Sequence, residues 1–321
     1  MKPLRSDPFI SQLCRWAEMD DLVSVTPRQQ NLTERFIVPI LPELTEWMDV
    51  CRDRVDDKLG DRGSPRSERK PYPEGYCKEI TQAMLGEIDF FIEKSSNRCA
   101  QMLSRFIQEG GVMKRIWGDL RGIYFQNAIQ LGGIYLDVAN DTVDIDKPRV
   151  EILPLAESGF RMIHEIEHFV SVAERYWQGE LFPNTVIPAL APVLPVVRVK
   201  PSGSIRLEPD TRTLFSRNLL NDCRSARRYV GESLQQGRIL PPVIAGQWID
   251  SLKHLPESPL LQELCIEVNP TLLAFYFDRA GQHHAWYQTA PMLQRVIETM
   301  KAIHAIEKLP VWPHSSIKPI R

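Results

Sequence analysis

Apolar side chains recur with a helical period between residues 113 and 131. On a helical wheel they form one arc, and polar residues such as Lys114 and Gln126 fall on the opposite side. Gly132 and Gly133 come next, and glycine commonly ends a helix because it adopts the left-handed conformation without a Cβ penalty. The pattern predicts a helix over residues 113–131 that stops at this glycine pair.

The period changes from helical to two after the glycine pair. Ile134, Leu136 and Val138 fall on one face of a short strand. Residues 139–147 are rich in aspartate, which is common in turns, and residues 149–155 have the pattern of a partner strand. These residues predict a β-hairpin near 134–155.

Most of the remaining chain has helical patterns. Helices are expected over residues 6–59 (interrupted at Pro39 and Pro42), 77–94, 97–108, 159–178, 211–238, 243–254 and from Thr289 onward. Five prolines between residues 181 and 201 exclude a helix there. The expected fold class is α+β, predominantly helical, with short β-hairpins near 134–155, 196–207 and 264–288.

A chain of 321 residues is long enough to bury a sizeable core. We expect a single large domain, 1–321, with a looser helical N-terminal part over 1–110. Residues 60–73 are charged and contain glycine, serine and proline, which predicts an exposed loop.

Composition excludes several classes of partner. The chain is 43% hydrophobic and 25% charged, as is usual for a soluble protein, and its net charge is −2 with a pI near 6.4. This balance gives no reason to expect nucleic acid as a partner, and no apolar run reaches the roughly 18 residues that a membrane span needs. Six scattered cysteines without a CxxC pair favour a cytoplasmic protein with reduced thiols. A small-molecule substrate is expected, and the oligomeric state is left open.

The residues GGIYLD, Gly132 to Asp137, resemble a motif of GT-A type glycosyltransferases, in which GGIYLD is followed after one residue by a second aspartate. In those families the carboxylates at the strand end hold a divalent metal that bridges the sugar-nucleotide diphosphate. The resemblance implies Asp137 as a catalytic and metal-binding carboxylate, with Mg²⁺ or Mn²⁺ as the cofactor. Ala139 occupies the position of the second aspartate, so Asn140 or Asp141 has to replace it. Asp141 is then a metal ligand and Asn140 a substrate-binding residue.

Asn127 falls inside the apolar arc of the expected helix, where a buried amide has to find partners or cost about 1–3 kcal/mol. It either ties this segment to a neighbouring backbone or helps to bind substrate.

Cys77 lies near a predicted helix start, where the helix dipole would lower the pKa of its thiol. Papain-like and transglutaminase-like enzymes use such a cysteine with a histidine on a later strand, and His283 or His284 is a candidate base. The alternative is a half-buried structural cysteine.

The segment from His164 to His168 fits the zinc motif H-E-x-x-H. Both histidines, however, fall on the polar side of the predicted helix, which favours a solvated face.

Three functions follow from these residues. The leading hypothesis is a divalent-metal-dependent, glycosyltransferase-like transferase centred on Asp137. The second is a cysteine-centred enzyme with Cys77 as its nucleophile. The third is a non-catalytic interaction or assembly protein that contacts a partner through the apolar, proline-rich segment 181–195.

Overall fold

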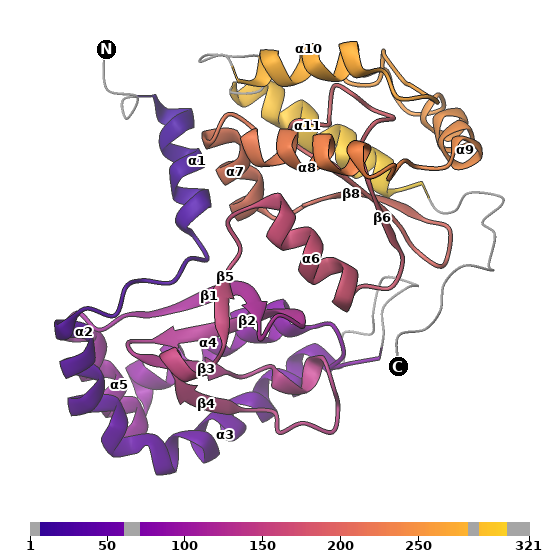
Figure 1. Cartoon of the computed structure of the whole chain (residues 1–321). Coiled ribbons are helices and arrows are strands. Elements are labelled where there is room, and N and C mark those ends of the chain that lie inside the picture. The colour runs from indigo at the N-terminus through magenta and orange to yellow at the C-terminus, as the bar shows by residue number, and fades with distance from the viewer. Residues whose placement is uncertain (1–6, 61–70, 282–288, 307–321) are drawn as a thin grey trace. The chain divides into compact units, whose positions relative to one another are not determined.

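The computed structural model describes residues 7–60, 71–281 and 289–306, which group into two compact units (Figure 1). Residues 20–162 form the inserted unit, and residues 1–19 together with 163–321 form the host unit. The expected single domain over residues 1–321 stays a prediction. Most of the predicted loop 60–73 lies outside the described residues.

Helices make up the first part of the inserted unit. Thr26 caps α2, because its side chain accepts a hydrogen bond from the Gln29 amide, and Pro27 occupies the first turn. A π-helical turn and a 3₁₀ turn at Pro39 then interrupt the helical chain, as the prolines predict. The bounds are α2 Pro27–Leu32, η2 Thr33–Ile37, η3 Val38–Ile40, α3 Leu41–Gly60, α4 Cys77–Lys94 and α5 Arg98–Gln108. The helices predicted over 77–94 and 97–108 are confirmed.

The second part of the inserted unit is a five-stranded antiparallel sheet in the order β4-β3-β2-β1-β5. Its elements are β1 Met113–Leu120, β2 Tyr124–Leu131, β3 Ile134–Asp137, η4 Asn140–Thr142, β4 Glu151–Pro154, η5 Leu155–Glu157 and β5 Phe160–Met162. The predicted hairpin near 134–155 is confirmed, because Ile134 pairs with Pro154 and Asp137 with Glu151.

The prediction of a helix over 113–131 is wrong. These residues form the β1–β2 hairpin, with a turn in which Arg121 and Gly122 both have positive φ angles, 59° and 72°. Every residue of β2 is buried, so its sequence does not alternate between apolar and polar residues as a half-exposed strand would. Without this alternation, the spacing of the apolar residues also fits one face of a helix.

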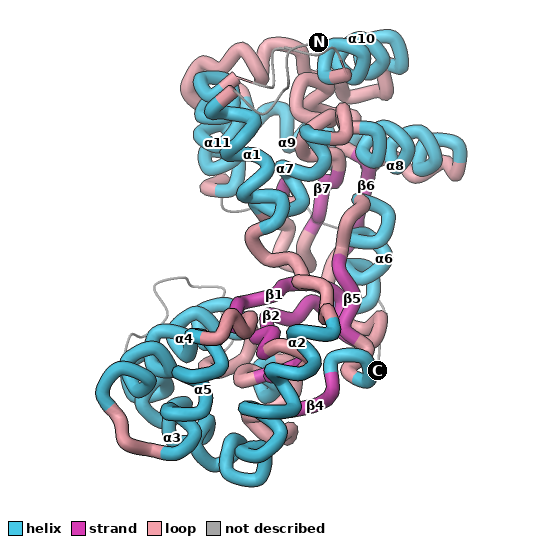
Figure 2. Tube along the Cα trace, turned by 90° about the vertical axis from the view of Figure 1, so that its left-hand side faces the viewer, coloured by secondary structure: helices cyan, strands magenta, loops and turns pink. Residues whose placement is uncertain are grey.

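The core of the inserted unit lies between its helices and its sheet. Leu44 of α3, Met84 of α4 and Phe106 of α5 pack with Ile129 and Leu136 in one buried cluster. In Figure 2 helices α3, α4 and α5 lie to the left of strands β1 and β2. The two ends of this unit are adjacent, since the Leu22 amide donates to the Met162 sulfur at 3.1 Å.

The host unit contains a three-stranded antiparallel sheet in the order β6-β7-β8 and seven helices among its described residues. The bounds are α1 Pro8–Glu18, α6 Ile166–Tyr176, β6 Glu180–Pro183, β7 Val196–Val199, β8 Ile205–Glu208, α7 Arg212–Leu220, α8 Arg224–Gln235, α9 Pro242–Leu252, α10 Pro270–Ala280 and α11 Ala290–His304. The hairpin near 196–207 is confirmed, because Val196 pairs with Glu208. The Arg217 guanidinium donates to the carbonyl oxygens of Ala17 and Ile163, each at 3.1 Å, and so holds the points where this unit is interrupted.

Two predictions for the host unit need correction. Residues 270–280 form α10 and not a strand of a hairpin at 264–288, because Asn269 caps a helix that has Pro270 in its first turn. Residues 282–288 lie outside the described residues. The helix expected over 159–178 is shorter, because Phe160–Met162 pairs with β1 and α6 begins only at Ile166.

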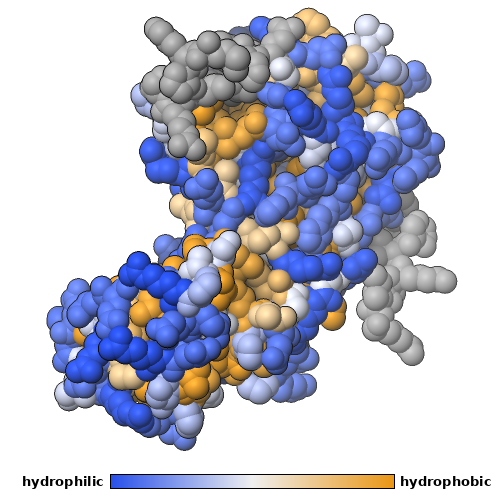
Figure 3. Space-filling model, turned by 60° about the vertical axis from the view of Figure 1, so that its left-hand side comes forward, coloured by the Kyte–Doolittle hydropathy of each residue, from blue (hydrophilic) through white to orange (hydrophobic). Residues whose placement is uncertain are grey.

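Hydrophilic residues cover much of the face drawn in Figure 3, with hydrophobic residues showing between them. Among the described helices, none combines the length and apolar character that a membrane crossing requires. The α+β fold class is confirmed.

Candidate functional site at the start of α4

Two residues selected from the sequence touch where α4 begins, and a third lies at the end of a neighbouring strand. Cys77 is the first residue of α4, Asn127 lies in β2, and Asp137 ends β3 (Figure 1). The Asn127 side-chain amide donates to the Cys77 sulfur at 3.4 Å. The Thr81 hydroxyl, one turn further along α4, donates to the Asn127 carbonyl oxygen at 3.0 Å. These two contacts join the first turns of α4 to β2.

Cys77 as a whole residue is partly exposed, but its thiol is buried, and the pKa of the thiol is raised and not lowered. Burial raises this pKa most, the hydrogen bonds with Asn127 oppose that effect, and the negative charge of Asp137 raises the pKa further. The expectation that the helix start lowers the pKa is therefore wrong, because burial of the thiol raises its pKa more than the hydrogen bonds with Asn127 lower it. His283 and His284, the bases considered for this cysteine, lie outside the described residues.

The Asp137 side chain has no exposed surface. Its carboxylate accepts hydrogen bonds from the Gln126 amide at 2.7 Å, the Tyr135 hydroxyl at 3.0 Å and the Ala139 amide at 2.9 Å. Burial raises the pKa of Asp137 to about 6, and these three donors limit the rise. The Gln126 side-chain oxygen is also buried, and it has no hydrogen-bond partner among the described residues.

Asp141 binds a different partner. Both of its oxygens accept hydrogen bonds from the guanidinium of Arg52, at 3.0 and 3.1 Å. Arg52 is itself fully buried in α3 and also donates to the Val138 carbonyl oxygen at 2.8 Å. Asn140 donates to the Pro148 carbonyl oxygen at 2.9 Å and so closes the acidic loop. These contacts fix the turn after β3.

The carboxylates of Asp137 and Asp141 are thus engaged by separate sets of donors, and they do not present an open pair to Mg²⁺ or Mn²⁺. Within residues 7–60, 71–281 and 289–306, no group of three or more histidine, cysteine, aspartate or glutamate side chains could hold a metal ion. The metal site implied by the glycosyltransferase resemblance stays a prediction without a supporting contact.

The H-E-x-x-H segment does not place two histidines on one helix. Glu165 is the N-cap of α6, so His164 precedes the helix and His168 lies within it. Arg228 of α8 pairs with Glu165 at 2.7 Å and with Glu167 at 2.6 Å. The acidic residues of this segment therefore tie α6 to α8.

Sequence reasoning missed the polar residues that surround the candidate site, Thr81, Arg115, Gln126 and Tyr135. Correct strand assignment would have found two of them, because β2 and β3 are antiparallel neighbours and Tyr135 and Asp137 share one face of β3. A helix over 113–131 placed Gln126 on a solvated side instead.

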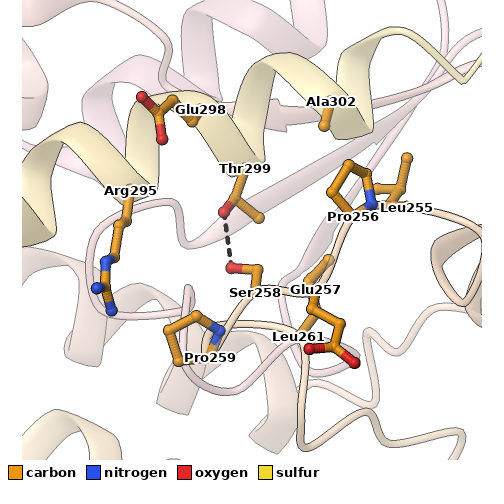
Figure 4. A pocket seen from close by; sticks show the side chains of 10 residues that line it. All are labelled: Leu255, Pro256, Glu257, Ser258, Pro259, Leu261, Arg295, Glu298, Thr299 and Ala302. Atoms are coloured by element: carbon orange, nitrogen blue, oxygen red, sulfur yellow. Dashed lines mark hydrogen bonds between the residues drawn. The ribbon is translucent and has the colours of Figure 1, made fainter.

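The host unit contains a cavity of about 510 Å³ between α11 and the loop after α9 (Figure 4). Thr299 points from α11 toward Ser258, and the two hydroxyl oxygens are 2.9 Å apart. None of the residues selected from the sequence lines this cavity.

No protein family model, curated protein or solved structure matches this chain.

Proposed function

We propose that Cys77, Asn127 and Asp137 form a cysteine-centred site that transfers acyl groups from small-molecule substrates. One observation carries the proposal: an amide from β2 donates to the Cys77 sulfur, while the same thiol feels the charge of Asp137 from the end of β3. The Cys77 sulfur is the nucleophile of the proposed site, a β2 amide donates to it, and the charge at the end of β3 influences it.

The proton balance assigns a role to each residue. In this proposal the thiol proton passes to Asp137 through one water molecule, and the Cys77 sulfur attacks the carbonyl carbon of an ester or thioester. The alcohol or thiol then leaves with the proton held by Asp137, and water hydrolyses the enzyme thioester, which releases the carboxylic acid and restores the thiol. A pKa near 6 keeps Asp137 mostly ionised at neutral pH yet close enough to accept a proton. The Asn127 N–H stabilises the negative charge that develops on sulfur.

The other two hypotheses have less support. A metal-dependent transferase needs carboxylate oxygens that Arg52 and the donors around Asp137 already occupy. A partner surface on segment 181–195 needs exposed apolar side chains, but Leu190 and Leu194 have no exposed surface.

The proposal is tested with p-nitrophenyl acetate as the acyl donor. We expect a burst of p-nitrophenolate and an acetyl group on the peptide that contains Cys77, both lost in Cys77→Ala. Asp137→Asn slows acylation by roughly 100-fold, as for the loss of a general base. The acylation rate of the unmodified protein rises as pH increases through about 6, because Asp137 then becomes ionised.

Cys265→Ala is the matched control, since Cys265 is also a partly exposed free cysteine but lies in the host unit. Its acylation kinetics should equal those of the unmodified protein. Equal acetylation of several cysteines, or a burst that survives Cys77→Ala, would refute the proposal.

A further inference from the structure

We propose that Arg115 is a positioning residue that holds the Asn127 amide with its N–H toward the Cys77 sulfur. This inference rests on the proposed function of Cys77. Arg115 lies in β1 and touches neither the sulfur nor the carboxylate of Asp137 in any described contact.

The orientation of the Asn127 amide follows from the chemistry of arginine. An Arg115 N–H donates to the side-chain oxygen of Asn127 at 3.2 Å. A guanidinium has only donors, so this contact requires the amide oxygen and excludes the amide nitrogen. The nitrogen is therefore left on the other side, where it lies 3.4 Å from the Cys77 sulfur. A flipped amide would place N–H groups against each other and an oxygen against the thiolate.

Asp20 in turn fixes Arg115. Its carboxylate accepts from the other terminal nitrogen of Arg115 at 2.6 Å, and both side chains are mostly buried, with 18% of Arg115 and 13% of Asp20 exposed. The Asp20 carbonyl oxygen accepts from the Trp117 amide at 3.1 Å, which ties Asp20 to β1. Asp20, Arg115, Asn127 and Cys77 thus form one chain of hydrogen bonds.

This chain acts on the thiol through Asn127. A cation at the amide oxygen polarises the amide and makes its N–H a stronger donor, since hydrogen bonds in series reinforce one another. The Asn127 bonds lower the pKa of Cys77 against the effect of burial. Loss of Arg115 should therefore raise the pH at which the thiol ionises.

The test is the rate of Cys77 alkylation by iodoacetamide as a function of pH, measured by mass spectrometry of the Cys77 peptide. We expect the midpoint to rise by about one pH unit in Arg115→Met, because the variant loses both a nearby cation and the contact that orients the Asn127 N–H toward the sulfur. Asp137 and Glu79, the acidic groups that act on Cys77, are unchanged in every variant. Arg161→Met is the control, because Arg161 lies on the same sheet and its loss removes the same charge.

Two further variants separate orientation from charge. Arg115→Lys keeps the cation but loses the two-pronged geometry, so orientation predicts a raised midpoint and charge alone predicts no change. Asp20→Asn removes a negative charge, so charge alone predicts a lower midpoint, whereas loss of the Arg115 anchor predicts a higher one. Raised midpoints in both variants support the inference. An unchanged midpoint in Arg115→Lys together with a lowered midpoint in Asp20→Asn overturns it.

The outcome is independent of the acyl-transfer test. An unmoved midpoint in Arg115→Met, with Cys77 still acetylated by p-nitrophenyl acetate, overturns the role of Arg115 and leaves the proposed function standing. A shifted midpoint without acetylation supports the orientation of Asn127 and overturns the acyl-transfer function.

Discussion

Arg52 has no exposed surface and donates four hydrogen bonds, two of them to Asp141. Replacement of one partner in a buried ion pair leaves the other charge unpaired in a medium that solvates it poorly. We expect Arg52→Met to lower the free energy of unfolding by about 3–5 kcal/mol, measured by urea denaturation.

Arg98→Met is the control for this prediction, because Arg98 pairs with Glu43 at the surface and both side chains are about half exposed. Its effect should stay below about 1 kcal/mol. Equal losses in the two variants would show that the Arg52 pair does not hold the turn after β3.

His304 of α11 accepts a hydrogen bond from the Leu207 amide of β8 at 2.9 Å, which requires an unprotonated ring nitrogen. Burial, together with the charges of Arg206 and Lys200, lowers the pKa of His304 to about 4. A lowered pKa in the folded state stabilises the protein above the unfolded pKa, near 6.5, and this stabilisation is lost as pH falls toward 4.

His304→Gln removes this titration while keeping an acceptor at the same position. We expect the stability difference between the unmodified protein and the variant to shrink as pH falls from 6.5 to 4, measured by denaturation at several pH values. A pH-independent difference would contradict the lowered pKa of His304.

At the level of elements, helices with local signals could be predicted and the longest hairpin could not. The helix over 77–94 has a regular apolar stripe, and α11 has Thr289 as its cap with Pro291 in its first turn. Such signals act between residues a few positions apart. The β1–β2 hairpin depends instead on the pairing of β2 with β1 and β3 and on the packing of α4 against β2, and every residue of β2 is buried.

The candidate site was predicted in part for the same reason. Cys77, Asn127 and Asp137 were each selected as polar or reactive residues at element ends or in apolar runs. Cys77 and Asn127 touch because α4 packs against β2, and this long-range contact has no local signal in the sequence. Arg115 could not be found while residues 113–131 were assigned to a helix, because the wheel placed it on the side opposite Asn127.

Gly118 allows β1 and β5 to approach each other. A Cβ atom at this position would collide with the Arg161 carbonyl oxygen of β5 and with the Phe160 ring. We expect Gly118→Ala to separate the two strands at a cost of about 1–3 kcal/mol, seen as faster hydrogen exchange of the β1 and β5 amides.

Gly86→Ala provides the comparison. A Cβ atom there meets no heavy atom within 4 Å, and alanine favours the α4 helix by about 1 kcal/mol. The two substitutions add the same methyl group and should change stability in opposite directions. Similar changes in the free energy of unfolding in the two variants would show that β5 can move away from the added methyl group without loss of stability.

At the scale of the whole molecule, each unit can be judged by whether its core is complete. The main hydrophobic cluster of the inserted unit uses only residues between 32 and 150. The host unit takes α1 from the other side of the insertion, and Leu13 of α1 has no exposed surface. We expect a fragment of residues 20–162 to unfold cooperatively by itself, measured by circular dichroism on heating.

A fragment of residues 163–321 should be less stable, because it lacks α1, and residues 1–19 joined to 163–321 by a flexible linker should restore that stability. A 20–162 fragment whose circular dichroism changes gradually on heating, without a cooperative transition, would contradict a core that is complete by itself.

The hydrogen bonds of Arg217 to the Ala17 and Ile163 carbonyl oxygens have a consequence for how this chain can change in evolution. The Arg217 side chain binds the host unit on both sides of the inserted unit, just before residue 20 and just after residue 162. The two ends of the inserted unit are themselves adjacent, because the Leu22 amide contacts the Met162 sulfur. This arrangement permits the gain or loss of the whole inserted unit without disruption of the host unit. We therefore expect related chains that have a different domain, or only a short loop, between the positions of Ala17 and Ile163.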